Sequence, residues 1–365
     1  MKLTADFTKD ISVAKPEPGA YEWWYFDGRD HKGEYQFVLI FYEGCPFSSK
    51  YIKNQSKNPD HEFAKASNYP AISISIYKNG KPVYYSMSEY GPNDATFNRD
   101  RVSLRVGDNT LEGFIDENDM LVYAIRLDET LPSGDHISGI MRFISPKPNP
   151  ELWSSLKSSS TSAHSWNLVQ PVAQVKGVLS VRTGDNHEKP IVFDGVGYHD
   201  HNIGREPMKN EFKDWYWGRI HFNDYSLVYY VMNTKHGQEA MAWIISADNQ
   251  SVIEAASNVR VDGVNINGFG LSSARRIEIK FSDFQILVQC RQIIDNGPFY
   301  MRFKSEARIQ RAGETDELSF GISEYIRPSR IHHRIFWPLV HMRYRFASQK
   351  PHWVQRSRFF YRWTW

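Results

Sequence analysis

The segment Ala71-Ile72-Ser73-Ile74-Ser75-Ile76-Tyr77 alternates apolar and polar side chains and is soon followed by Asn79-Gly80. Such alternation is typical of a strand with one buried face, because successive side chains of a strand point to opposite sides. Asn-Gly favours a type I′ turn, in which both central residues adopt positive φ. Val83-Tyr84-Tyr85 follows, so the stretch predicts a β-hairpin.

Strand signals of the same kind continue along the whole chain. They are separated by clusters of Asn, Asp and Gly, and no long helix-period segment precedes the C-terminal tail, apart from a short one near 150–157. The segments are 21–26, 35–42, 102–106 and from 111 in the first half, and 178–182, 215–222, 226–232, 241–245, 276–281 and 284–290 in the second. Many short strands predict an all-β fold of sandwiches or barrels.

The length of 365 residues suits two domains. A serine-rich run at 158–162, inside the segment 154–165, favours a linker there. We therefore expect an N-terminal domain at 1–165, a C-terminal domain at 166–326 and a tail at 327–365. Aromatic residues make up 15% of the chain, which indicates either a large β core or a cavity lined with rings.

The cysteines and the N-terminus favour a cytoplasmic protein. Cys45 and Cys290 lie far apart and fit no metal or redox spacing, although a disulfide stays open. Residues 1–6 lack a signal pattern, and no window approaches a transmembrane span.

Glu22-Trp23-Trp24-Tyr25-Phe26-Asp27 is the first of three clusters that carry chemistry. On a strand, Glu22, Trp24 and Phe26 share one face, so a carboxylate lies among rings. The alternative is a structural Glu22 paired with an arginine.

Tyr198-His199-Asp200-His201-Asn202 is the second cluster, and it is a costly stretch to bury without a function. His199 and His201 point the same way, as in a metal site, and Glu206 nearly completes a cupin pattern. However, Lys213 stands where that pattern has glycine. We therefore expect no metal, and expect proton transfer by His and Asp instead.

The third cluster is Asp214-Trp215-Tyr216-Trp217-Gly218-Arg219. Trp215 and Trp217 share a face and Tyr216 opposes them. Taken alone, these residues are as typical of core aromatics, with an Arg219 that reaches water, as they are of a functional site.

Together, ordered motifs along the chain resemble the carotenoid 1,2-hydratases (hydroxyneurosporene synthases) and the related AttH-like proteins. The motifs are Glu22-Trp23-Trp24-Tyr25-Phe26, His164-Ser165-Trp166, Gly197-Tyr198-His199-Asp200-His201-Asn202, Trp215-Tyr216-Trp217-Gly218-Arg219, Gly297-Pro298-Phe299-Tyr300 and Gly321-Ile322-Ser323-Glu324-Tyr325. The resemblance implies two lipocalin-like antiparallel β-barrel domains packed together.

The resemblance also implies addition of water to a terminal C=C bond of an acyclic carotenoid, without a cofactor. An isolated alkene is a weak base, so the acid must be strong and dry, and a buried carboxylic acid fits that role. Asp200 is the expected acid, with His199 or His201 reloading it or orienting water, and Tyr198 with the ring faces of Trp215 and Trp217 stabilising the carbocation. The expected substrate contacts are Glu22, Trp24, Asn202, Trp215, Trp217, Arg219 and Glu324. An isomerase or cyclase that shapes a bound polyene, and a non-catalytic pigment or lipid carrier, stay open.

The tail is basic and aromatic. After Glu324 it contains nine Lys or Arg residues and no Asp or Glu, while the rest of the chain has 35 basic against 42 acidic residues. Trp and Arg together favour peripheral contact with the inner face of the cell membrane. A tail folded back on the acidic body is the alternative, and nucleic-acid binding is not expected, since no nucleic-acid module is present. Pro328, Pro338 and Pro351 argue against one long helix.

Overall fold

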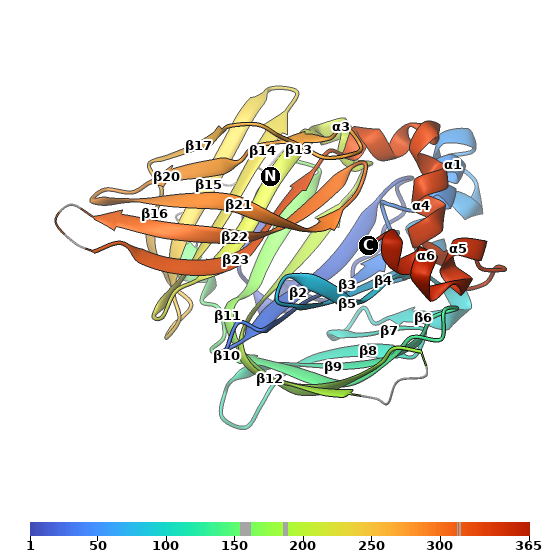
Figure 1. Cartoon of the computed structure of the whole chain (residues 1–365), viewed down its shortest axis with the longest axis horizontal. Helices are drawn as coiled ribbons and strands as arrows, with labels where there is room; N and C mark the ends of the chain where they lie inside the picture. The colour runs from blue at the N-terminus through green and yellow to red at the C-terminus, as the bar shows by residue number, and fades with distance from the viewer. Residues whose placement is uncertain (154–161, 185–188, 312, 314) are drawn as a thin grey trace. The chain divides into compact units, whose positions relative to one another are not determined.

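The computed structural model describes residues 1–153, 162–184, 189–311, 313 and 315–365. These residues form two compact units, one of Met1–Pro207 with Arg334–Trp365 and one of Met208–His333. Figure 1 shows that both consist mainly of strands, which confirms the all-β class.

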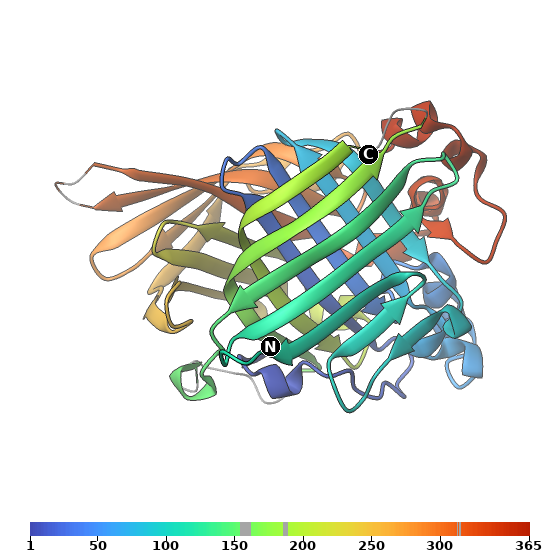
Figure 2. The same ribbon diagram turned by 90° about the horizontal axis from the view of Figure 1, so that it is seen from below.

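The first unit is built on a 13-stranded curled sheet, whose strands run side by side in Figure 2. Its order is β24-β5-β4-β3-β2-β12-β11-β10-β9-β8-β7-β6, with β1 added beside β11. Pairing is antiparallel except for the short β1 and β24, which run parallel to β11 and β5. The strands are β1 (Lys2–Thr4), β2 (Tyr21–Asp30), β3 (Tyr35–Glu43), β4 (Ala71–Lys78), β5 (Lys81–Glu89), β6 (Ala95–Phe97), β7 (Ser103–Val106), β8 (Asn109–Ile115), β9 (Leu121–Thr130), β10 (His136–Ser145), β11 (His164–Arg182), β12 (Lys189–Gly204) and β24 (Arg345–Phe346).

The hairpin expected around Asn79-Gly80 is confirmed. Lys78 pairs with Lys81 across the turn, and φ is 51° at Asn79 and 72° at Gly80, as a type I′ turn requires. The strand expected at 21–26 is longer than predicted, because β2 continues to Asp30 and pairs with β12 as well as β3.

The division between the units differs from the expected boundary after residue 165, which falls inside β11 (His164–Arg182). Strands β11 and β12 belong to the first sheet because β11 pairs with β10 and β12 pairs with β2. Most of the expected linker, residues 154–161, lies outside the described residues.

Two β-bulges interrupt the pairing of β11 with β12, one between Leu168 and Gln170 and one between Gln170 and Ala173. A bulge adds an unpaired residue to one strand and increases its bend and twist. The long β11 can therefore curve with the sheet and still pair along its length.

The second unit contains a nine-stranded sheet in the order β16-β15-β14-β13-β23-β22-β21-β20-β17 and a separate pair, β18-β19. Its core includes Tyr216, Ile220, Tyr229, Ile277 and Tyr325. The strands are β13 (Phe212–His221), β14 (Tyr225–Thr234), β15 (Gly237–Ser246), β16 (Val252–Ala255), β17 (Asn258–Asp262), β18 (Asn265–Ile266), β19 (Ser272–Ser273), β20 (Arg276–Lys280), β21 (Phe284–Asn296), β22 (Tyr300–Arg311) and β23 (Glu317–Ile326). The expected second-half strands from 215 onward are thereby confirmed.

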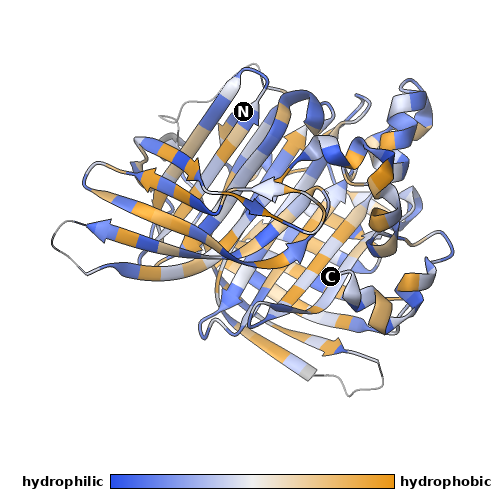
Figure 3. Ribbon diagram, turned by 45° about the horizontal axis from the view of Figure 1, so that its top comes forward, coloured by the Kyte–Doolittle hydropathy of each residue, from blue (hydrophilic) through white to orange (hydrophobic). Residues whose placement is uncertain are grey.

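Helical segments are short in both units. They are η1 (Phe7–Lys9), α1 (Ser49–Lys57), η2 (Glu62–Ala64), η3 (Ala66–Asn68), η4 (Pro92–Asp94) and α2 (Pro150–Trp153), then α3 (Met208–Glu211), η5 (Pro328–His332), η6 (Arg334–Phe336), α4 (Trp337–Arg343), α5 (Trp353–Arg356) and α6 (Arg358–Trp363). In α1, which strand patterning did not predict, the Ser48 side chain accepts the amide hydrogen of Tyr51 as an N-cap. Along the strands, hydrophobic and hydrophilic residues alternate in Figure 3.

The end of the chain, from Arg334, folds back on the first unit. Tyr344 donates a hydrogen bond to Glu89 at 3.0 Å, and Arg358 pairs with Asp135 at 3.2 Å. Tyr361 is 1% exposed. The alternative of a tail docked on the acidic body is therefore what the structure shows, and no described helix is long and apolar enough to cross a membrane.

Candidate functional site

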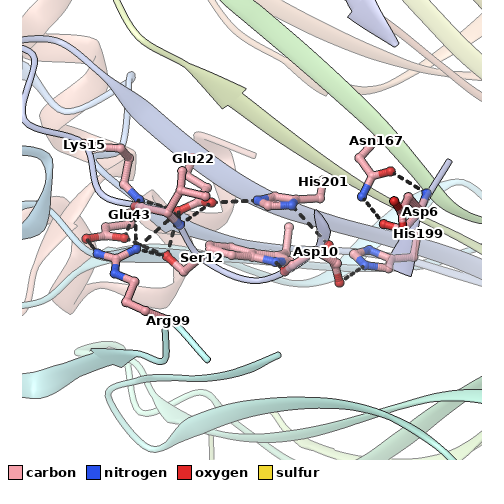
Figure 4. A network of polar contacts seen from close by, with 12 residues as sticks. Asp6, Asp10, Ser12, Lys15, Glu22, Glu43, Arg99, Asn167, His199 and His201 are labelled. Atoms are coloured by element: carbon pink, nitrogen blue, oxygen red, sulfur yellow. Dashed lines mark hydrogen bonds and ion pairs between the residues drawn. The ribbon is translucent and has the colours of Figure 1, made fainter. Parts of the chain in front are cut away.

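Two buried polar clusters lie on the two faces of strand β12. The larger one, the ion-pair network, joins seven ionisable residues of both signs and Ser12 in the first unit, all of them buried except Arg99, whose side chain is 41% exposed (Figure 4). Its members are Asp10, Ser12, Lys15, Glu22, Glu43, Arg99, His199 and His201.

His201 lies between two carboxylates. Its Nδ1 is 3.2 Å from Asp10 Oδ1, and its Nε2 is 2.9 Å from Glu22 Oε1. Next to it, His199 Nε2 is 3.2 Å from Asp10 Oδ2. One aspartate from the N-terminal segment therefore contacts both histidines of the His-Asp-His motif.

The other end of the network carries Lys15 and Arg99. Lys15 Nζ pairs with Glu22 and lies 2.6 Å from Glu43 Oε2, while Arg99 Nη2 is 2.8 Å from Glu43 Oε1. Ser12 donates to Glu22 at 2.8 Å. Glu22 is thus a paired carboxylate. Lys15 and His201 are its nearest basic partners, and Arg99, the arginine that the alternative interpretation asked for, has Nη1 3.8 Å from Glu22 Oε2.

The pKa shifts in the network favour the charged forms of its acidic and basic groups. Burial raises the pKa of Asp10, but the charge and hydrogen bond of His199 and the bond of His201 outweigh burial and bring it to about 2. Burial lowers the pKa of His201, but its bonds to Asp10 and Glu22 raise it to about 9. Burial also acts against ionisation of Glu22, and His201 and Lys15 hold its pKa below the ordinary value. At neutral pH, His201 is therefore an imidazolium that bridges two carboxylates.

Aromatic rings enclose both histidines. Trp24 stacks on His201 with 4.5 Å between ring centroids, and Phe26 stacks on His199 at 3.9 Å. Tyr123 contacts His199 edge-on at 4.4 Å and donates a hydrogen bond to Asp10. The shared face expected for Glu22, Trp24 and Phe26 is confirmed, since all three contact the histidines.

Asp200 forms the second cluster on the opposite face. Its Oδ2 accepts hydrogen bonds from Trp166 Nε1 at 2.7 Å and from the Tyr198 hydroxyl at 2.7 Å, and its Oδ1 accepts from Asn202 Nδ2 at 2.8 Å. Asp200 is 3% exposed. The expected grouping of Tyr198, Asp200 and Asn202 is therefore present.

The structure does not bring Asp200 together with His199 or His201. Neighbouring residues of a strand point to opposite faces, and here each face has its own partners. The expectation that either histidine reloads Asp200 directly is wrong for this geometry. The described residues contain no group of three or more His, Cys, Asp or Glu side chains placed to hold a metal ion.

Trp215, Trp217, Arg219 and Glu324 lie in the second unit. The first three share the face of β13 opposite Tyr216 and Ile220, which belong to that unit's core. Glu324 on β23 pairs in register with Trp217 and accepts a hydrogen bond from Arg302 Nε at 2.8 Å. Arg219 is only 1% exposed, so its guanidinium does not reach water. This differs from the interpretation of the third cluster as core aromatics with a solvated arginine.

Comparison with known proteins places this fold and these motifs in a family. Residues 39–352 match the family model described as carotenoid hydratase CrtC. The chain belongs to the carotenoid hydratase CrtC family. It is 26% identical to "hydroxyneurosporene dehydrogenase" of Chlorobaculum tepidum over 92% of this chain and 90% of the relative. It is also 26% identical to "acyclic carotenoid 1,2-hydratase" of Thiocapsa roseopersicina, over 82% of this chain and 67% of the relative.

Solved structures share the fold of this CrtC-family chain. A putative AttH protein of Nitrosomonas europaea aligns with a TM-score of 0.60 at 12% identity, covering 88% of this chain and 97% of that one. CghA, crystallised with Sch210972, aligns with a TM-score of 0.58 at 13% identity, over 89% and 97% of the two chains. These likenesses confirm the AttH-like, lipocalin-like architecture.

Several residues of the two clusters in this CrtC-family chain were not expected from the sequence. Asp10 and Lys15 lie in an N-terminal segment with no strand pattern, and Arg99 lies in a loop. His164 stood in a quoted motif without a role. Its position, opposite Gly204 at the start of β11, brings it within reach of Asn202.

Proposed function

We propose that this protein adds water across a C=C bond of an acyclic carotenoid or a similar isoprenoid polyene, with Asp200 as the proton donor. Family membership and the name of the Thiocapsa relative support the reaction class. The observation that carries the residue assignment is the buried Asp200 carboxyl with three side-chain donors.

Protonation of an isolated alkene requires a strong acid that is shielded from water. Each donor that bonds the carboxylate stabilises the product of proton transfer, so the carboxylic acid becomes a better donor to a weakly basic alkene. In the proposed reaction, the Asp200 proton forms a C–H bond at one alkene carbon and leaves a carbocation at the other. Water then bonds to the cation, and its surplus proton returns to Asp200. The reaction therefore balances without a cofactor.

Rings near Asp200 suit a cationic intermediate. Tyr198 donates to the carboxylate, and its ring meets Tyr25 at 6.2 Å in an edge contact. Ring faces attract cations, more strongly where water is excluded. Asn202, which donates to Asp200, remains a proposed substrate contact, whereas Trp215, Trp217, Arg219 and Glu324 belong to the second unit and are not part of the Asp200 cluster. His199, His201, Glu22 and Trp24 are instead assigned to holding the N-terminal segment.

The test is an assay of purified protein with an acyclic carotenoid, with the product read by mass. The proposal expects a gain of one water and a loss of about 100-fold or more in rate for Asp200→Asn. A product of unchanged mass would favour an isomerase or cyclase, and tight binding without turnover would favour a carrier. Full activity of Asp200→Asn would remove Asp200 from the proposal.

We also propose that the tail contacts an anionic membrane surface, where such a substrate resides. An aromatic patch of Trp353, Phe359, Phe360 and Trp363 is exposed by 60%, 75%, 44% and 77%. Trp353 and Phe359 each contact the Phe360 ring, at 5.3 and 5.4 Å. Exposed rings beside arginines suit the headgroup region of a bilayer.

Vesicle sedimentation tests the tail. We expect binding to phosphatidylcholine vesicles that contain phosphatidylglycerol and weaker binding when the anionic lipid is left out. We also expect the double variant Phe359→Ser with Trp363→Ser to lose this binding. Ile335→Ser is the matched control, because Ile335 is 79% exposed in the same segment but outside the patch. Equal binding by wild type and the double variant would exclude the aromatic patch.

A further inference from the structure

A chain of buried side chains leads from Tyr21 to Asp200. The Tyr21 hydroxyl is 2.9 Å from His164 Nδ1, His164 Nε2 is 3.2 Å from Asn202 Oδ1, and Asn202 Nδ2 is 2.8 Å from Asp200 Oδ1. All four residues are less than 5% exposed. They come from three adjacent strands, β2, β11 and β12.

The direction of each bond follows from the carboxylate. Once Asp200 has given its proton to the alkene, its carboxylate can only accept, so Asn202 must turn its amide nitrogen to Asp200 and its oxygen to His164 to stabilise that state. That oxygen also only accepts, so Nε2 of His164 must carry a hydrogen. Burial lowers the pKa of His164 to about 3, so the ring is neutral and has one N–H. Its Nδ1 is therefore the acceptor for the Tyr21 hydroxyl.

We infer that His164 is a positioning residue for Asp200: as the neutral Nε2–H tautomer, it fixes the Asn202 amide so that this amide donates to the carboxylate. The inference rests on the proposed role of Asp200 as the acid. If the Asn202 amide turned over, its oxygen would face the carboxylate, which would remove a donor and weaken the acid.

The surroundings hold this arrangement in place. A Cβ atom at Gly204 would lie 2.1 Å from Cζ of Tyr21, so only glycine leaves room for the Tyr21 ring beside His164. The rings of Tyr21 and Trp23 stack at 5.2 Å, and both contact the His164 ring at 5.9 and 5.8 Å. His164 thus has a fixed ring position from which each nitrogen meets one partner.

A matched pair of substitutions separates the two ring nitrogens. The amide nitrogen of His164→Gln can reach the Nε2 position and donate to Asn202, whereas the shorter His164→Asn reaches only the Nδ1 side. We expect His164→Gln to retain most of kcat and His164→Asn to lose about 10-fold with KM little changed. The pH profile of His164→Asn should move to higher pH, because Asp200 loses support for its ionised form.

The nitrogen spectrum of the ring gives a readout that needs no activity. In ¹⁵N-histidine-labelled protein between pH 6 and 8, His164 should be neutral with the proton on Nε2, and Tyr21→Phe should weaken that preference. A protonated ring, or a proton on Nδ1, would overturn the inference whether or not hydration is observed. The expected tautomer with equal kcat in both His164 variants would overturn it too. Absence of hydration in wild type, with the expected tautomer, would instead count against the proposed function alone.

Discussion

Asp200 and His201 are adjacent in the chain, but the carboxylate and the imidazole leave opposite faces of strand β12. Asp200 bonds to Trp166, and His201 stacks on Trp24. The two residues are therefore parts of different clusters, so substitutions on one face should change catalysis and substitutions on the other should change stability.

Two tryptophans test this separation. Trp166 and Trp24 are both fully buried, and each donates one Nε1–H bond, to Asp200 at 2.7 Å and to the Asp10 carbonyl at 3.0 Å. Trp166→Phe should lower kcat on the order of 10-fold, because the carboxylate loses a donor. Trp24→Phe should lower the unfolding midpoint and leave kcat near wild type. Equal kcat losses in the two variants would contradict the assignment of Asp200 to the catalytic face.

Removal of one charge from the ion-pair network should destabilise the fold. Lys15→Met keeps the aliphatic stem but leaves Glu22 and Glu43 short of a cation, so we expect a loss of roughly 3–5 kcal/mol in unfolding free energy. Lys9→Met is the control, since Lys9 pairs with Asp6 at 3.4 Å with its side chain 57% exposed, and should change stability by less than about 1 kcal/mol. Urea unfolding measures both, and similar small losses would show that the network contributes little.

Stability should fall as pH rises from neutral. The pKa of His201 is raised from 6.5 to about 9 in the folded protein, so its contribution is complete below pH 6.5 and is lost as pH rises through 9. On the acid side, the pKa of Asp10 is lowered to about 2, so its contribution is lost as pH falls from about 4 toward 2.

The comparison is wild type against His201→Gln in urea at a series of pH values. The difference between their midpoints should be largest near pH 6 and should shrink by pH 9.5. A difference that stays constant across this range would mean that His201 is neutral in the folded protein.

The docked tail should contribute to stability through its buried side. Tyr361 is 1% exposed and donates to the Arg343 carbonyl at 3.3 Å, so Tyr361→Ala should cost roughly 3–5 kcal/mol or release the tail to protease. Phe359→Ala, two residues earlier and 75% exposed, should leave thermal unfolding and proteolysis unchanged. Equal protection of the tail in both variants would contradict the docking.

The local features of this chain could be predicted from its sequence. Alternation at Ala71–Tyr77 gave the strand, and Asn79-Gly80 gave the turn, because both depend on neighbouring residues. The same rule placed Glu22 and Trp24 on one face. The same rule implies that His199 and Asp200 point to opposite faces, which the joint role first expected for them did not take into account.

The long-range features could not be predicted. Asp10 and Lys15 meet His201 and Glu43 only after the N-terminal segment has folded onto β2, β3 and β12, and no local pattern reports that contact. The basic tail has an acidic partner in Asp135, but arginines between aromatic residues suit a membrane equally well. The charge of the tail was therefore compatible both with docking on the first unit and with contact to a membrane.

The paired bulges in β11 also determine which length changes the protein can accept. Deletion of one residue from 169–172 would turn over one part of the strand, so that either Trp166 would leave Asp200 or Val175 would leave the core. Deletion of two residues would restore both orientations. The protein should therefore tolerate insertions or deletions of an even number of residues in this segment, but not of an odd number.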